Sequence, residues 1–301
     1  MESFIKALSE ESNSIYFVEG ERNARYPYSH SMIFGDYLID TGISPKRLRK
    51  VIKSFQINHV LLSHWHEDHI SGNYLIKNKR FYCHEKDKPI IEDISKMNLY
   101  YNTENTPVGE ELKNLLDVLR MQNTFVDYTI ENDQIFQISA DLDLQVIHTP
   151  GHTAGHCGFY EKNSKICFFG DIDLTKYPYY GNIDASLIEF EHSIEILENM
   201  DIEIAVTGHK NPIIGKSEIK EEFERYKLIL KQRDERILMR LREFDKPINS
   251  IDLQGQNLIY TKYTIFKNFE LISEVLMLNK HFEKLEKAGQ IIKEKNGFIL
   301  N

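Results

Sequence analysis

The chain has 301 residues, of which 41% are hydrophobic and 28% are charged, so it has enough apolar side chains for a core and lacks the composition of a disordered protein. Its net charge of −9 is uneven, because residues 220–301 carry 16 Lys and Arg against 13 Asp and Glu, and the first 219 residues are strongly acidic. An acidic domain does not attract polyphosphate over long distances, so nucleic acid is a possible but not a favoured partner.

The chain carries no sequence feature of membrane insertion or secretion. No run approaches eighteen apolar residues, and the first residues lack a basic segment followed by a long apolar core. The cysteines Cys83, Cys157 and Cys167 are too few and too scattered for a disulfide framework, which fits a reducing compartment. We therefore expect a cytoplasmic protein without a membrane partner.

The first part of the chain alternates predicted strands and helices, as a sheet covered by helices requires. In chain order these are strands over 14–18, 31–34 and 37–39, a helix over 45–56, a strand ending at Leu62, a helix over 70–76 and a strand over 81–83, followed by a mostly helical excursion over 86–121.

Four potential metal ligands follow the apolar run that ends at Leu62. They are His64, His66, Asp68 and His69, in the pattern H-x-H-x-D-H. Imidazole nitrogen and carboxylate oxygen are the ligands that first-row divalent ions accept, and two imidazoles two positions apart in extended chain point the same way. The pattern therefore predicts a metal site and favours zinc or iron over calcium.

Further polar residues follow apolar runs in the same manner, including runs that predict strands over 125–147 and 166–169. They are Asp40, His152, Asp171 and His209. Five places of this form, spread over about 170 positions, are hard to obtain by chance. We interpret the other histidines considered as non-ligands: His84, His148, His156 and His192. Asp173 is interpreted as a surface or supporting group.

The last part of the chain is predicted to be helical. Helices are expected over 186–200, over 221–243 as one long helix or two, and over 270–288. Asn296 and Gly297 lie between two short apolar runs and predict a hairpin. Helices followed by a small hairpin resemble a winged-helix module, so we predict a catalytic domain at 1–218 and a helical domain at 219–301. Because opposite charges alternate along the last helix, packing against the first domain or formation of a homodimer is favoured over nucleic-acid binding.

The ordered motifs at Asp40, His64 to His69, His152, Asp171 and His209 resemble those of the metallo-β-lactamase superfamily. The resemblance covers the chain to about residue 215 and implies an α/β fold, an αββα sandwich with the small C-terminal domain as an appendage. The extension itself resembles that of the lactamase-beta-like branch, and the ligand set resembles that of glyoxalase II-like enzymes.

The resemblance also implies roles for the ligands. A first cation would be bound by His64, His66 and His152, a second by Asp68, His69 and His209, and both by Asp171, with Asp40 orienting a ligand from outside. Two Zn²⁺ ions are expected, with Fe or Mn as alternatives. Two groups are candidate catalytic residues: Asp68, which would carry a proton, and Tyr180, in a loop from which lactonase-like relatives direct a tyrosine to the reacting carbonyl.

Three functions remain open in order of preference. The first is a hydrolase in which a hydroxide shared by two metals attacks a small ester, thioester or lactone. The alternative is an endoribonuclease or phosphodiesterase of the lactamase-beta-like kind, and a second alternative is an enzyme resembling mononuclear iron persulfide dioxygenases. Asp171 stands where the best-known zinc β-lactamases have a cysteine, which argues against antibiotic hydrolysis. A binding protein without catalysis is the least favoured.

Overall fold

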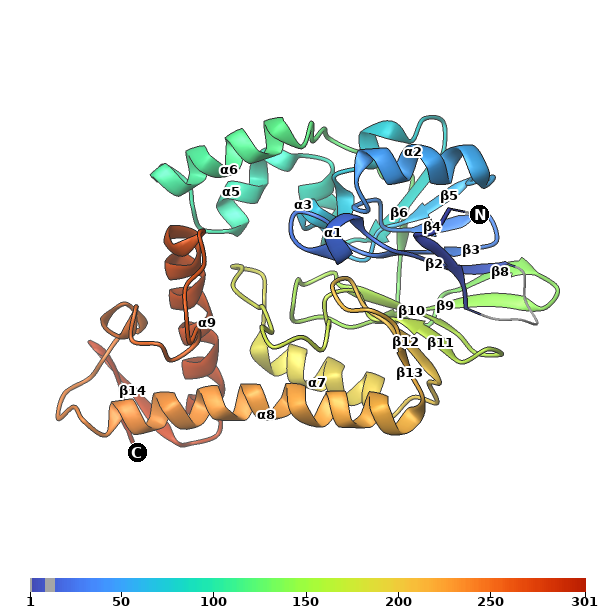
Figure 1. Cartoon of the computed structure of the whole chain (residues 1–301). Helices are drawn as coiled ribbons and strands as arrows, with labels where there is room; N and C mark the ends of the chain where they lie inside the picture. The colour runs from blue at the N-terminus through green and yellow to red at the C-terminus, as the bar shows by residue number, and fades with distance from the viewer. Residues whose placement is uncertain (1, 9–13) are drawn as a thin grey trace.

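Two β-sheets face each other in the computed structural model, which describes residues 2–8 and 14–301 (Figure 1). Among these residues one sheet has seven strands in chain order: β1 (Ile5–Ala7), β2 (Ile15–Val18), β3 (Ser31–Phe34), β4 (Tyr37–Ile39), β5 (His59–Leu61), β6 (Arg80–His84) and β7 (Tyr128–Ile130). The first three pairings are antiparallel and the last three are parallel.

The other sheet has six strands among the described residues. Their order is β13 (Ile213–Ile214), β12 (Ile204–Val206), β11 (Ile166–Phe168), β10 (Cys157–Glu161), β9 (Leu142–His148) and β8 (Ile135–Ser139). Strands β11 and β12 are parallel, and the other neighbours pair antiparallel.

Strands of the second sheet alternate between two apolar environments. On β11, Ile166 and Phe168 pack between the sheets, whereas Cys167 packs on the helical side. On β12, Val206 packs between the sheets and Ala205 packs on the helical side. Successive side chains of a strand point to opposite faces, so these near-continuous apolar runs bury both faces of the sheet.

Helices cover the outer face of each sheet (Figure 1). The first sheet is covered by α2 (Pro45–Ser54), α4 (Lys88–Ile91), α5 (Met97–Tyr100) and α6 (Pro107–Val118), and the second by α7 (Leu187–Glu198) and α8 (Lys216–Leu241). Leu48 of α2 packs in one cluster with Val60 of β5, and Phe190 of α7 packs in another with Cys167. The predicted αββα sandwich is therefore confirmed.

One local prediction differs from the structure. In place of a helix over 70–76, α3 spans Glu67–Ile70 and a 3₁₀ turn spans Asn73–Leu75. Gly72 separates them, and a Cβ atom there would lie 2.3 Å from the carbonyl oxygen of Thr41. The close approach of the chain after β4 therefore requires glycine at this position.

The C-terminal region continues the second half of the sandwich. Helix α8 is one helix of 26 residues that starts at Lys216, so the predicted boundary at residue 218 lies in its first turn. Its side chains join a single apolar cluster that runs from Phe223, under the second sheet, to Leu241 beside α9 (Lys267–Lys287). The predicted hairpin is present as β14 (Ile291–Glu294) and β15 (Gly297–Leu300). Three further short helical turns are α1 (Glu21–Ala24), Ile94–Lys96 and Ser250–Leu253.

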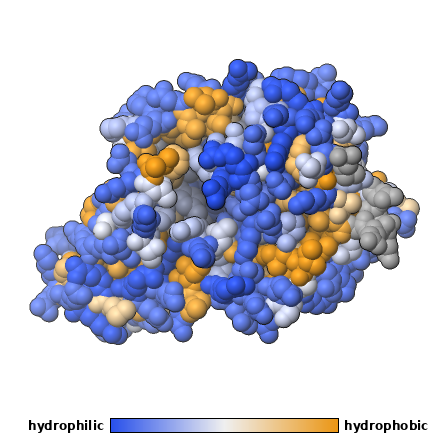
Figure 2. Space-filling view, in the orientation of Figure 1, coloured by the Kyte–Doolittle hydropathy of each residue, from blue (hydrophilic) through white to orange (hydrophobic). Residues whose placement is uncertain are grey.

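The molecular surface is largely hydrophilic on the face shown in Figure 2, with separate hydrophobic patches and a recess near the middle. Ile265 and Phe266, directly before α9, are exposed apolar residues. Among the described helices, none is long and apolar enough to cross a membrane.

Candidate metal centre

The predicted ligands meet at one edge of the sandwich, in loops that directly follow strands. Strands β4 and β5 run parallel, as do β11 and β12, so the loops after them emerge at the same end of each sheet. The donor atoms gather into two groups: His64, His66, His152 and Asp171, and Asp68, His69 and His209. All seven predicted ligands are thus brought together.

In the first group, three imidazole nitrogens point at a common place. His152 Nε2 lies 2.8 Å from His66 Nδ1 and 3.2 Å from His64 Nε2. The remaining distance, between His64 Nε2 and His66 Nδ1, is 3.1 Å. Burial lowers the pKa of all three rings and favours the neutral imidazole, which is the form that binds a cation.

Asp171 lies between the two groups. Its Oδ2 is 3.5 Å from His152 Nε2 in the first group and 3.4 Å from His209 Nε2 in the second, while its Oδ1 is 2.9 Å from His69 Nε2. Although burial opposes ionisation, the neighbouring His69 and His209 lower the pKa of Asp171 well below its usual value. The side chain is therefore an ionised carboxylate placed to contact two cations.

In the second group, protons on His69 and His209 compensate the negative charge of Asp171. Burial opposes a charge on His69, but the carboxylates of Asp171 and Asp40 raise its pKa to about 10. Burial likewise opposes a charge on His209, whose pKa Asp171 and Asp68 nevertheless raise well above its usual value. A cation bound here would replace these protons as the counter-charge.

Backbone carbonyls fix two of the ligand rings from outside. His152 Nδ1 donates to the carbonyl oxygen of Tyr179 at 2.8 Å, and His209 Nδ1 donates to that of Ala24 at 2.8 Å. With its Nδ1 protonated, each neutral ring presents the lone pair of Nε2 to the centre, so the fold selects the tautomer suited to a metal.

Asp40 is placed as the sequence analysis expected. Its Oδ2 accepts from His69 Nδ1 at 2.7 Å and from the Ser63 hydroxyl at 2.7 Å. Ser63 Oγ in turn lies 2.9 Å from His64 Nδ1. The Asp40 carboxylate therefore orients the His69 ring directly and the His64 ring through the Ser63 hydroxyl.

Two buried polar atoms in the centre face each other without a hydrogen bond. His69 Nε2 and Asp171 Oδ1 form an ion pair at 2.9 Å, but neither makes a hydrogen bond within the described part of the chain. Buried polar atoms of this kind are costly unless a ligand satisfies them. Together with the converging nitrogens, they show that the residues of the two groups fit divalent cations.

The prediction for Tyr180 requires correction. Its side chain is fully buried and its hydroxyl lies 2.7 Å from His281 Nε2 and 2.9 Å from Arg233 Nη1, so it points into the C-terminal region rather than at the ligands. Its neighbour Tyr179 has its ring centroid 5.8 Å from that of His66. Because neighbouring side chains of an extended loop point to opposite sides, the sequence identified the loop but not the residue that faces the centre.

Sequence reasoning also missed Asp87, which joins two ligand loops. Its carboxylate accepts from the backbone N–H of Trp65 at 3.1 Å, from the Thr153 hydroxyl at 2.8 Å and from the backbone N–H of Gly155 at 2.7 Å. Trp65 lies between His64 and His66, and Thr153 follows His152. The signal available in the sequence was an acidic residue soon after a strand, which is common.

Replacing Asp87 with alanine is expected to destabilise the fold by about 2–4 kcal/mol, because it leaves three buried donors without an acceptor. Chemical denaturation monitored by circular dichroism measures the loss. Asp143→Ala, at an exposed position on β9, is the control and should change stability by less than about 0.5 kcal/mol. An equal stability of the two variants would contradict this role.

A second residue missed from the sequence is Glu67, inside the H-x-H-x-D-H motif. It is buried, and it accepts hydrogen bonds from the hydroxyls of Tyr26 at 2.5 Å and Tyr101 at 2.6 Å. The aromatic rings of these tyrosines contact Phe266 and Phe269, with centroid distances of 5.6 and 5.2 Å. The N-terminal end of α9, with Phe266 just before it and Phe269 in its first turn, therefore borders the metal centre through aromatic side chains.

The other histidines lie outside the two groups. His84 stacks on His148 with ring centroids 4.1 Å apart. His156 supports the centre from behind, accepting from the backbone N–H of Asp171 at 2.9 Å. His192 is exposed on α7. Asp173 is buried rather than superficial, beside Asp171, and burial raises its pKa to about 6.

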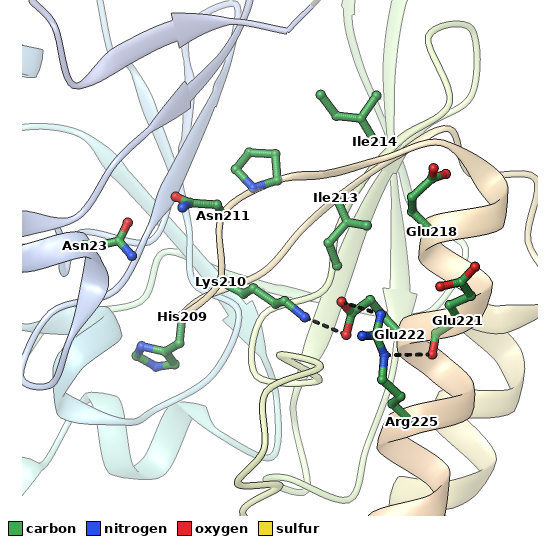
Figure 3. A pocket seen from close by; sticks show the side chains of 11 residues that line it. Asn23, His209, Lys210, Asn211, Ile213, Ile214, Glu218, Glu221, Glu222 and Arg225 are labelled. Carbon is green, nitrogen blue, oxygen red and sulfur yellow. Dashed lines mark hydrogen bonds and ion pairs between the residues drawn. The ribbon is translucent and has the colours of Figure 1, made fainter.

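A surface groove of about 460 Å³ borders the centre on the side of His209 (Figure 3). Lys210 and Arg225 both pair with Glu222 along its wall. Of the seven ligands, His209 alone lines this groove, so it adjoins the metal centre rather than containing it.

The chain is similar in sequence to curated proteins. A curated relative from Caenorhabditis elegans, a "Beta-lactamase-like protein 2 homolog", is 23% identical over 269 residues, which cover 84% of this chain and 80% of that protein. The "Hydroxyacylglutathione hydrolase GloC" of Haemophilus influenzae is 26% identical over 141 residues, or 45% of this chain, and the match spans only 59% of that enzyme.

The fold has close structural counterparts. A beta-lactamase domain protein from Burkholderia ambifaria superposes with a TM-score of 0.70 at 14% identity, over 99% of this chain and 93% of that one. The sequence model of the metallo-beta-lactamase superfamily matches residues 35–209, a segment that begins before Asp40 and ends at His209. Because the match spans more than half of the chain and all seven ligands, the chain belongs to the metallo-beta-lactamase superfamily.

Proposed function

We propose that this protein is a dinuclear metal-dependent hydrolase that cleaves a small thioester, ester or lactone. The observation that carries the dinuclear part is the position of Asp171, whose Oδ2 lies 3.5 Å from a nitrogen of the first ligand group and 3.4 Å from one of the second. Two cations would polarise the scissile carbonyl and lower the pKa of water from 15.7 toward about 7.

The chain's own residues would prepare the site for this chemistry. His64, His66 and His152 present neutral nitrogens on one side of Asp171, and the second group presents a carboxylate, Asp68, on the other. Asp68 Oδ2 lies 3.2 Å from His209 Nε2. We assign to Asp68 the transfer of a proton to the leaving group, because it is both a ligand and the carboxylate next to Asp171.

Aromatic side chains around the first group support a small organic substrate. The Tyr101 ring stacks on His66 with centroids 5.5 Å apart, and the Tyr179 ring lies 5.9 Å from that of His152. Apolar rings bind acyl groups by excluding water. The similarity to a hydroxyacylglutathione hydrolase favours a thioester within this class.

An endoribonuclease remains the second candidate function. It is supported by the match to beta-lactamase-like protein 2 homologs, which extends past the family domain into the C-terminal region. The acidic charge of the first 219 residues counts against it. A mononuclear iron oxygenase is disfavoured, because the described ligands form two groups rather than one.

One experiment distinguishes these functions. Protein purified without added metal is analysed for zinc, iron and manganese, and is assayed on a thioester, a lactone, a phosphodiester and single-stranded RNA. We expect two cations per chain and the highest kcat/KM for the thioester. If the protein cleaves RNA but does not hydrolyse the thioester, the second candidate function is correct instead. If it contains one iron per chain and consumes oxygen, both hydrolase functions are excluded.

A further inference from the structure

The C-terminal helices place a buried arginine against the loop over residues 177–182. Arg233 of α8 is only 2% exposed. Its Nη1 donates to the carbonyl oxygen of Pro178 at 2.8 Å and to the hydroxyl oxygen of Tyr180 at 2.9 Å. A buried guanidinium is costly unless it is hydrogen-bonded, and because Arg233 Nε has no partner in the described part of the chain, the two contacts of Nη1 tie the arginine to this loop.

The contacts continue from Tyr180 into α9 and back to α8. The Tyr180 hydroxyl donates to His281 Nε2 at 2.7 Å, and His281 Nδ1 donates to Asp234 Oδ1 at 2.6 Å. Asp234 Oδ2 accepts from Lys284 Nζ at 2.6 Å. Burial lowers the pKa of His281 to about 4, so the ring is neutral at pH 7 and can accept from Tyr180 at Nε2 while it donates to Asp234 from Nδ1. We call Arg233, Tyr180, His281, Asp234 and Lys284 the polar network.

The segment held by this network carries a contact to the metal centre. Tyr179 lies between the two loop residues that Arg233 contacts, and its carbonyl oxygen accepts from His152 Nδ1 at 2.8 Å. A displaced carbonyl would release the ring from its orientation and tautomer. Loss of such an outer partner typically weakens metal binding by about 10–100-fold.

We propose that Arg233 is a positioning residue for the first metal site, acting on His152 through Pro178, Tyr179 and Tyr180. The proposal rests on cation binding by the two ligand groups and makes no assumption about the substrate. It gives the C-terminal region a specific task, because a residue outside the matched family segment orients a ligand inside it. His69 and His209 are held by Asp40 and Ala24 instead, so the second site does not depend on Arg233.

The test measures zinc affinity without substrate, by competition with a chromophoric chelator, for Arg233→Met and Tyr180→Phe. We expect the dissociation constant of one Zn²⁺ to rise by about 10–100-fold and that of the other by less than about threefold. In a His209→Ala background, which retains the complete first group, the single remaining Zn²⁺ should show the full effect. The visible spectrum of Co²⁺ at that site should also change.

Arg240→Met is the matched control, since Arg240 lies on the same helix but donates to Gln256 away from the loop. Its two zinc affinities should equal those of the wild type. Arg233→Lys should recover at least half of the lost binding free energy, because its ammonium can reach one of the two oxygens. If Arg233→Met does not fold, the zinc affinity of Tyr180→Phe, which removes only one hydroxyl, still tests the positioning role.

The role of Arg233 would be refuted by unchanged zinc affinities in a folded Tyr180→Phe or Arg233→Met protein, or by equal losses at both sites. The proposed function fails separately, if the wild-type protein binds no second cation or hydrolyses none of the substrates. A wild-type protein with two cations and unaltered affinities in both variants would overturn only the positioning role.

Discussion

Asp171→Asn is expected to lower hydrolytic turnover by about a thousandfold, equivalent to about 4 kcal/mol of activation free energy. The substitution keeps the shape of the side chain but removes its negative charge. Asp171 lies within 4 Å of histidine nitrogens from both groups, since it contacts His64 and His152 in the first and His69 and His209 in the second. Its amide would leave two adjacent cations without a shared anion.

Metal content and kcat/KM, measured on the same preparation, check this expectation. The protein should retain at most one tightly bound cation, and added zinc should not restore turnover. Asp143→Asn, which makes the same chemical change at an exposed position of β9, should behave as the wild type. Full activity with two cations in Asp171→Asn would remove the basis for a dinuclear centre.

Removal of the metals is expected to abolish turnover and to lower the melting temperature. A cation present at about a thousand times its dissociation constant stabilises the folded state by about 4 kcal/mol, which corresponds to about 10 °C for a chain of this size. The physical cause is the set of converging nitrogens and the buried His69 Nε2 and Asp171 Oδ1, which make no hydrogen bond in the described part of the chain and which a cation would satisfy.

Dialysis against a strong chelator, followed by calorimetry and assay, makes the measurement. Readdition of Zn²⁺, Mn²⁺ or Fe²⁺ in separate samples should restore both properties and rank the metals. The His66→Ala protein serves as the control, because its weakened site should respond less to the chelator. A chelated protein that melts at the same temperature as the untreated one would show that the centre was empty at the start.

The strands and ligands were predictable because both signals are local. A short apolar run followed by a polar residue reports a buried strand and the loop after it, whatever surrounds them. The residues over 31–34 and 37–39 became β3 and β4 with the predicted bounds, and Asp40 follows directly. The spacing of His64, His66, Asp68 and His69 likewise specifies a local ligand cluster.

The loop over 177–182 shows where local signals end. Three of its residues are tyrosines, and composition does not tell which one faces the metals. The choice of Tyr179 over Tyr180 depends on Arg233 and His281, which lie 53 and 101 positions from Tyr180 in the chain. The predicted helix over 70–76 is also absent, and Gly72 within it packs against the Thr41 carbonyl, a contact between segments that the local pattern does not show.

The type of fold and the seven candidate ligands could be predicted from the amino-acid sequence, since apolar runs and ligand residue types are properties of short segments. The residues that hold those candidate ligands in position are seen only in the folded structure. Asp87, Tyr179 and Arg233 act through contacts between segments far apart in the chain, and each uses a residue type that is common at other positions. Hydrogen bonds between segments that meet only in the folded protein leave no periodic pattern in the sequence.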